Sequence, residues 1–107
     1  NQAAREKIKP GNKASEIDFA ARELIAHQGY ADYFLHRTGH GIGLEAHESP
    51  YISQSNEQII KPGMVFTIEP GIYITGEGGA RIEDNVVMTE NGAQTITNMS
   101  RELIFLK

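Results

Sequence analysis

Hydrophobic residues in the first third of the chain recur at helical spacing. One apolar face is formed by residues three and four positions apart: Ile17, Ala20, Ala21, Leu24 and Ile25. Ser15 and Asp18, three positions apart, resemble a capping box at the start of this helix, and Gly29 is expected to end it. A shorter helical segment is predicted over residues 1–9, ended by the Pro-Gly pair that follows.

The rest of the chain has the pattern of short strands separated by turns. Residues 36–48 are too rich in glycine for a stable helix and are interpreted as strand and loop. Pro70 and Gly71 interrupt one apolar run, which predicts a strand that bends there. Strands are expected at residues 33–35, 64–74, 81–88, 94–97 and 102–105. Helices followed by β-structure predict an α+β fold with helices packed on one face of a mainly antiparallel sheet.

Length and composition limit the possible functions. The chain has 107 residues, a formal net charge of −4 and scattered basic residues, so one domain is expected and nucleic acid is not an expected partner. Its apolar runs are far shorter than the roughly 20 residues that cross a bilayer, so no membrane association is expected. The chain has no cysteine, which is compatible with the cytoplasm, the expected location. Without cysteine, imidazole and carboxylate groups are the side chains available as metal ligands. Because the first residue is not methionine, we expect a larger parent protein.

Three of the four histidines lie close together in the glycine-rich segment: His36, His40 and His47. Imidazole is the commonest metal ligand and an acid–base group near neutral pH, so the cluster suggests a site. A solvated surface loop explains the same cluster, and the sequence pattern leaves both interpretations open. The spacing of His36 and His40 is not that of the zinc-binding helix motif, since a glycine lies between them.

Two carboxylates interrupt apolar strands. Glu69 stands directly before the Pro-Gly pair, and Glu83 is expected in the strand that starts at Arg81. A buried carboxylate needs a cation or hydrogen-bond donors. These residues therefore pair with Arg81, lie exposed on a sheet edge, or join a histidine in a metal site built from hard ligands. Arg81 and Glu83 share one face of an alternating strand, whereas Asp84 faces the other way and is interpreted as structural.

Three longer blocks resemble a known family. FLHRTGHGIGLEAHESPYI, KPGMVFTIEPGIYI and GARIEDNVVMT are similar to successive signature blocks in the C-terminal half of Xaa-Pro metallopeptidases, the aminopeptidase P and prolidase group. The resemblance implies that residues 1–107 are the C-terminal part of a single pita-bread catalytic domain. It also implies that the chain forms half of the pita-bread fold, with helices packed on a curved, mainly antiparallel sheet. The upstream part of the domain would then be missing from this sequence.

The resemblance also implies a set of metal ligands. The family holds two divalent metal ions with two aspartates, one histidine and two glutamates, and the last three correspond to His40, Glu69 and Glu83. Manganese is the expected metal, with cobalt or zinc as alternatives. Neither Asp18 nor Asp32 fits the two aspartates, which lie upstream in the family. The isolated chain is therefore expected to be inactive and to bind metal weakly or not at all.

The remaining implied roles concern the substrate. Glu69 is expected to be a catalytic proton shuttle as well as a ligand, while His36 and His47 line the substrate cleft and assist catalysis, and Arg81 contributes to binding. The implied substrates are small peptides with proline in second position, cleaved before the proline by a homo-oligomer. Two alternatives remain: a metal-free relative that acts as a binding module or a non-peptide hydrolase, and a folded half whose uncovered apolar surface causes self-association.

Overall fold

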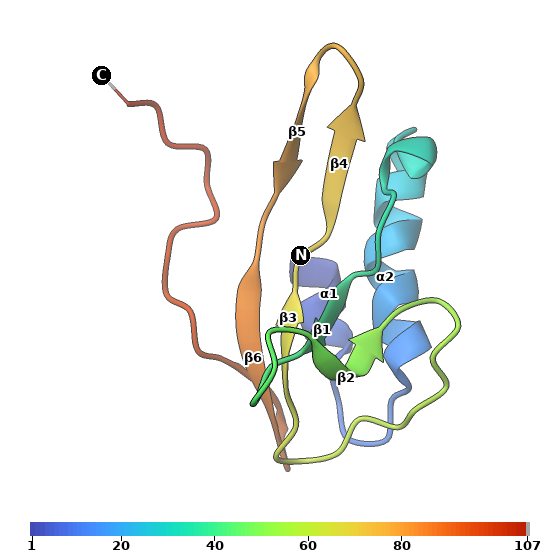
Figure 1. Ribbon diagram of the computed structural model, residues 1–107, viewed down its shortest axis with the longest axis vertical. Helices are drawn as coiled ribbons and strands as arrows, with labels where there is room; N and C mark the ends of the chain where they lie inside the picture. The colour runs from blue at the N-terminus through green and yellow to red at the C-terminus, as the bar shows by residue number, and fades with distance from the viewer. Residues whose placement is uncertain (107) are drawn as a thin grey trace.

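A five-stranded antiparallel sheet with two helices packed against it forms the body of the protein (Figure 1). The computed structural model describes residues 1–106. The helices are α1 (Gln2–Lys7), α2 (Ala14–His27) and the 3₁₀ helix η1 (Ala31–Tyr33). The strands are β1 (Gly39–Gly41), β2 (Glu48–Ile52), β3 (Val65–Ile68), β4 (Gly71–Ile74), β5 (Gly78–Arg81), β6 (Asp84–Thr89) and β7 (Gly92–Thr95). The predicted α+β class with a mainly antiparallel sheet is confirmed.

The strand order of the large sheet is β2-β1-β3-β6-β7, and all four pairings are antiparallel. Strands β4 and β5 form a separate hairpin, drawn at the top of Figure 1. Phe66 of β3 pairs with Val86 of β6, so their side chains share one face of the sheet. The short strand β1 lies between β2 and β3, inside the sheet rather than at its edge.

The hydrophobic core lies between the helices and this face of the sheet. The helical segments and their connections contribute Ala4, Ile8, Ala14, Ile17 and Ala21. The sheet contributes alternating residues of its strands, as expected when one face is buried: Ile52, Phe66, Ile68, Val86 and Met88. Each of these side chains is almost completely excluded from solvent. Their burial fixes the register in which the strands pair, and this register sets the positions of the polar side chains on the same strands.

The start of α2 differs from the prediction. Lys13 is the N-cap residue, and its backbone amide donates to the Glu16 carboxylate over 2.8 Å. Ser15 instead donates to Glu57 over 2.9 Å. The capping box assigned to Ser15 and Asp18 is therefore wrong, because the N-cap is two residues earlier, at Lys13, and Asp18 is completely buried.

The apolar run at residues 33–35 is not a strand. Its first residue ends η1, Phe34 is buried, and Leu35 is 73% exposed. The carbonyl oxygen of Phe34 accepts a hydrogen bond from the side chain of Arg22 over 3.0 Å instead of pairing with a neighbouring strand. A side chain from α2 thus takes the place of a strand partner.

The predicted strand at 81–88 is divided in two. β5 ends at Arg81 and β6 begins at Asp84, which leaves Ile82 and Glu83 between them. The break is necessary because β5 pairs with β4 in the hairpin, whereas β6 pairs with β3 in the large sheet. The expectation that Glu83 lies within a strand is therefore wrong.

The two strands expected near the end of the chain have different outcomes. The first corresponds approximately to β7, which pairs with β6 after the tight turn at Asn91. Residues 102–105 form no strand and extend away from the body of the protein (Figure 1). Leu103 and Phe105 are 80% and 84% exposed, so hydrophobicity alone did not give this segment a partner in the sheet.

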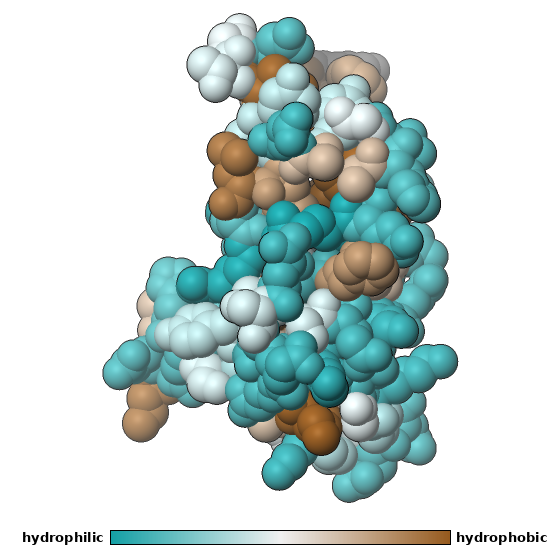
Figure 2. Space-filling view, turned by 90° about the vertical axis from the view of Figure 1, so that its right-hand side faces the viewer, coloured by the Kyte–Doolittle hydropathy of each residue, from teal (hydrophilic) through white to brown (hydrophobic). Residues whose placement is uncertain are grey.

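The surface is mostly hydrophilic on the face shown in Figure 2, where hydrophobic residues form several separate patches. Among residues 1–106, no helix has the length and hydrophobicity needed to span a membrane.

Candidate active site

An open pocket of about 660 Å³ collects most of the predicted site residues. Its lining residues come from β1, β2, β5 and the loops between strands: His36, Arg37, His40, His47, Tyr51, Ser53, Glu69 and Arg81. The three clustered histidines therefore share one cavity with a carboxylate and a guanidinium group. Glu83 is not among the lining residues, although it contacts Arg81.

His40 is held at the centre of β1 by close backbone packing. It is buried, with 8% of its surface exposed, and glycines flank it on both sides. A Cβ atom at Gly39 would collide with the carbonyl oxygen of Thr67, and one at Gly41 would collide with that of Ser49. Because glycine alone allows this approach, the sequence Gly-His-Gly places the imidazole at a fixed position between two strands.

The imidazole of His40 and the carboxylate of Glu69 are in direct contact. Nδ1 of His40 lies 3.0 Å from the carbonyl oxygen of Gly41, and a carbonyl can only accept, so Nδ1 carries the hydrogen. Nε2 then points at Oε1 of Glu69 over 3.1 Å. A neutral Nε2 and an ionised carboxylate both present lone pairs, so this contact requires a shared proton or a cation bound to both groups.

Glu69 is oriented by neighbouring residues of the sheet. Its backbone amide donates to the carbonyl oxygen of Thr38 over 2.7 Å. The hydroxyl of Thr67 donates to Oε1 of Glu69 over 2.8 Å and accepts from the backbone amide of His40 over 3.0 Å. The carboxylate therefore has one conformation relative to the imidazole, as an acid–base group or a ligand requires.

Arg81 lies between the two glutamates. Its Nε is 3.7 Å from a carboxylate oxygen of Glu69 and 3.7 Å from one of Glu83. Tyr73 and then Glu69 raise the pKa of Arg81, so the guanidinium remains charged. The ion-pair interpretation of the two glutamates therefore describes the arrangement in this structure. The sequence analysis did not predict Tyr73 as a neighbour of Arg81, because an aromatic residue in an apolar strand is usually part of the core.

His47 and His36 lie on other sides of the pocket that contains His40 and Glu69. The ring of His47 is 4.2 Å from that of His40, measured between centroids. The ring of His36 lies 5.5 Å from that of Tyr73, and its Nδ1 is 2.7 Å from the carbonyl oxygen of Arg37. The hydrogen of His36 is therefore on Nδ1, and Nε2 is a buried acceptor without a hydrogen-bond partner.

The residues fit a metal ion only in part. Within residues 1–106, no group of three or more His, Asp or Glu side chains is arranged to hold a metal ion. His40 and Glu69 supply one nitrogen and one oxygen in contact, a donor pair suited to a divalent ion such as manganese or zinc. Glu83 is exposed and contacts Arg81. Asp84 is buried and accepts hydrogen bonds from Thr97 and Arg101.

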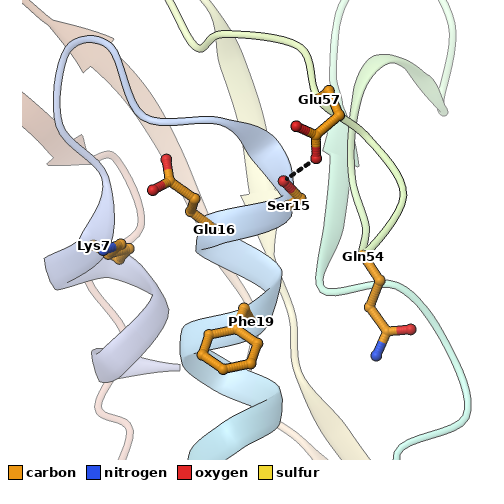
Figure 3. Close-up of a pocket in the computed structure, with 6 residues that line it drawn as sticks. All are labelled: Lys7, Ser15, Glu16, Phe19, Gln54 and Glu57. Carbon is orange, nitrogen blue, oxygen red and sulfur yellow. Dashed lines mark hydrogen bonds between the residues drawn. The ribbon is translucent and has the colours of Figure 1, made fainter.

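A second pocket lies beside the helices, away from the histidines. It has a volume of about 460 Å³ and is lined by Lys7, Ser15, Glu16, Phe19, Gln54 and Glu57. Figure 3 shows the hydroxyl of Ser15 directed at Glu57, while the ring of Phe19 lies one helical turn further along α2. The carboxylate of Glu57 accepts hydrogen bonds from Lys13 and Ser15, and that of Glu16 accepts from residues at the start of α2. We therefore do not assign a catalytic role to this pocket.

Comparison with known proteins identifies the family. Residues 1–90 match the profile of metallopeptidase family M24. The chain belongs to this family. Within family M24, it is 58% identical over 101 residues to an Xaa-Pro dipeptidase from Pyrococcus furiosus. The aligned residues cover 94% of this chain and 29% of that protein.

Solved structures of related proteins have the same fold. A dipeptidase from Pyrococcus horikoshii OT3 gives a TM-score of 0.96 at 51% identity, over 98% of this chain and 30% of that one. An X-Pro aminopeptidase from Thermotoga maritima gives a TM-score of 0.91 at 44% identity, over 94% of this chain and 29% of that one. This M24 chain therefore spans less than a third of the length of these relatives.

Proposed function

We propose that the protein carrying this chain hydrolyses the peptide bond between an N-terminal residue and a following proline, with divalent metal ions. The supporting observation is the contact between His40 Nε2 and Glu69 Oε1 over 3.1 Å, a nitrogen and an oxygen directed at each other that suit a divalent ion as well as a shared proton. The relatives named as Xaa-Pro dipeptidase and X-Pro aminopeptidase support the same reaction.

His40, Glu69 and Glu83 are the proposed metal ligands of this chain. Bound divalent ions supply Lewis acidity and an activated water at such sites. His40 is already directed by the hydrogen bond from Nδ1 to the carbonyl oxygen of Gly41. Glu69 is both a ligand and the group that carries a proton from the water to the leaving amine. Glu83 joins this set when Arg81 releases it, because the guanidinium now pairs with both glutamates.

The histidines on either side have substrate roles. His36 presents a buried Nε2 without a partner, and His47 lies against the ring of His40, so both rings border the space where a peptide would sit. We assign both rings to binding the scissile part of the peptide and to stabilising the negative charge that develops on its carbonyl oxygen. Arg81 binds and orients carboxylate groups at the edge of the pocket.

We further propose that this chain alone is inactive. Three side chains provide too few ligands to neutralise and position two divalent ions, and the family resemblance places two further aspartates upstream. We therefore interpret residues 1–107 as the C-terminal part of a single catalytic domain. Manganese is the proposed metal, and calorimetry that finds two tight manganese sites on the isolated chain would contradict this interpretation.

The deciding experiment measures Ala-Pro hydrolysis by the complete protein with and without a chelator. Glu69→Gln keeps the size of the side chain but removes its charge, and we expect a loss of kcat of about 100- to 10,000-fold. Glu77→Gln, an exposed change in the turn of the β4–β5 hairpin, is the matched control. Full activity in chelator, or in Glu69→Gln, would favour a metal-free relative. Activity on Ala-Pro but not on Ala-Pro-Ala would identify a dipeptidase.

A further inference from the structure

A buried ion pair on α2 connects the helix to the histidine segment. Asp18 is completely buried, and Arg22, one helical turn later, donates to it from Nε over 2.9 Å and from Nη2 over 3.1 Å. The backbone amide and the hydroxyl of Thr38 both donate to the same carboxylate, over 3.1 and 2.9 Å. Asp18 thus receives donors from its own helix and from the residue that precedes β1.

Arg22 extends this connection to two more points of the backbone. Nη1 donates to the carbonyl oxygen of Phe34 over 3.0 Å, and Nη2 donates to that of His36 over 2.9 Å. The guanidinium also lies 4.1 Å from the centroid of the Phe34 ring. Two side chains of α2 therefore hold the backbone at residues 34, 36 and 38, which lie between η1 and β1.

Thr38 carries the connection into the candidate active site. Its side chain and amide bind Asp18, while its carbonyl oxygen accepts from the backbone amide of Glu69 over 2.7 Å. His36 is held on the other side of Arg37, with its ring packed edge-on against Phe34 at 5.2 Å. The segment held by the ion pair is thus the one that sets the positions of His36 and Glu69.

A second ion pair in the protein has similar geometry without this connection. Arg101 donates to the buried carboxylate of Asp84 from Nε and from Nη2, over 2.7 Å each. The hydrogen bonds of Arg101 go to Asp84, whereas those of Arg22 also reach the backbone of Phe34 and His36. A buried ion pair is often no more stabilising than apolar residues of the same size, so stability alone does not explain the additional contacts of Arg22.

We propose that Asp18 and Arg22 are positioning residues that hold the backbone of residues 34–38 so that the imidazole of His36 lines the pocket between Phe34 and Tyr73, with its hydrogen on Nδ1. The inference deepens the proposed function and rests on it for the role of the pocket. Loss of the two carbonyl contacts lets the segment move toward solvent, and the His36 ring leaves its place between Phe34 and Tyr73.

The test compares Arg22→Lys with Arg101→Lys. Lysine keeps the positive charge beside each aspartate but lacks the planar group that reaches several acceptors at once. The first readout is the ¹H–¹⁵N spectrum of the imidazoles at pH 8.5, where neutral rings report which nitrogen carries the hydrogen. We expect His36 to be the Nδ1–H form in the wild type and in Arg101→Lys, and a mixture of both forms in Arg22→Lys.

The second readout is kcat/KM for Ala-Pro in the complete protein. Misplacement of a group in an active site by about 1 Å costs about 100-fold, so we expect Arg22→Lys to lose about 10- to 100-fold and Arg101→Lys to stay within about twofold. A folded Arg22→Lys with wild-type imidazole signals and wild-type kcat/KM would overturn the proposal. So would equal losses of kcat/KM in the two variants.

Thr38→Val provides a second variant if Arg22→Lys does not fold. It removes one hydroxyl contact to Asp18 and leaves Arg22 in place, so a smaller change in the same His36 signals is expected. Unchanged His36 signals in Thr38→Val would count against the proposal. If the wild-type protein does not hydrolyse Ala-Pro, the proposed function fails, whereas the imidazole spectra still decide whether Asp18 and Arg22 position His36.

Discussion

The hydroxyl of Thr67 donates to Oε1 of Glu69 over 2.8 Å, and this is the same oxygen that faces His40. Thr67 is buried, and its hydroxyl also accepts from the backbone amide of His40. One side chain therefore fixes the carboxylate relative to the strand that bears the imidazole. If the proposed cation binds both groups, Thr67 would control the geometry of its binding site.

Thr67→Val is expected to weaken metal binding without changing the fold. Valine has nearly the same shape as threonine but cannot donate to Glu69, and loss of such supporting hydrogen bonds costs about 10- to 100-fold in metal affinity. Titration calorimetry of the complete protein with Mn²⁺ measures the effect. Thr89→Val is the control, since that hydroxyl bonds the backbone of the β6–β7 turn. Equal affinities in both variants would show that Thr67 does not orient the carboxylate.

Gly41→Ala is expected to destabilise the sheet. Its Cβ would collide with the backbone of Ser49 in β2, so two strands would have to separate. Overpacking of this kind costs about 1 to 3 kcal/mol, and backbone atoms cannot rotate out of the way. Denaturant unfolding compares this variant with Gly11→Ala, where the added Cβ meets open space and only the positive φ of 89° is unfavourable. A smaller loss in Gly41→Ala than in Gly11→Ala would contradict the close approach.

Asp84 makes the stability of the protein depend on pH in acid. Burial raises the pKa of its carboxyl, but hydrogen bonds from Arg101 and Thr97 outweigh burial and hold the pKa below its ordinary value. The stabilisation is therefore complete above the unfolded-state pKa of about 3.9 and is lost as the pH falls through the folded-state pKa.

Asp84→Asn is the variant that tests this dependence. At pH 7 we expect it to lower the free energy of unfolding by about 2 to 3 kcal/mol, because Arg101 loses a buried partner. Urea unfolding from pH 7 to pH 2 should show the difference from the wild type shrinking in acid. A constant difference over this range would mean that ionised Asp84 does not contribute.

The apolar tail predicts self-association of the chain on its own. Leu103 and Phe105 are exposed on a segment that leaves the sheet, and burying them against a second copy is favourable. Sedimentation of the isolated chain is expected to show dimers or larger species that decrease when both residues are changed to serine. Leu44→Ser, at a fully exposed leucine in a loop, serves as the control. A monomer at high concentration would contradict this prediction for the isolated chain.

The local parts of the fold were predictable from the sequence. Helix α2 follows from the spacing of Ile17 and Ala21, both of which are buried in the core. The bend between β3 and β4 follows from Pro70, which has no amide hydrogen to donate to a neighbouring strand. These features depend on residues close together in the chain, which is the information that a pattern of hydrophobic positions contains.

The remaining features depend on partners distant in the sequence. Asp18 was assigned to a helix cap because its pairing with Thr38 spans 20 positions. Phe34 was assigned to a strand because nothing in its neighbourhood shows that Arg22 binds its carbonyl oxygen. Local patterns do not contain such pairings.

The candidate site was predictable only in part for the same reason. His36, His40 and His47 were grouped by their proximity in the chain, and the structure places all three in one pocket with Glu69. The close approach of Gly39 and Gly41 to the backbone of neighbouring strands was not predicted from the glycine-rich segment. The pairing of Glu83 with Arg81 was one of the alternatives that the sequence left open, and the structure has it. The break that leaves Glu83 outside a strand was not predictable, since it depends on where β5 leaves the hairpin and β6 enters the sheet.

The packing of Gly39 and Gly41 against neighbouring backbone limits how this region can change in evolution. Neither position can accept a larger residue unless an adjacent strand moves. Substitutions at these two glycines, which flank His40, are therefore not available for changing substrate specificity. Variants with altered substrate preference should therefore arise at the rim, at positions such as Tyr51 and Ser53, whose side chains border the pocket without filling space between strands.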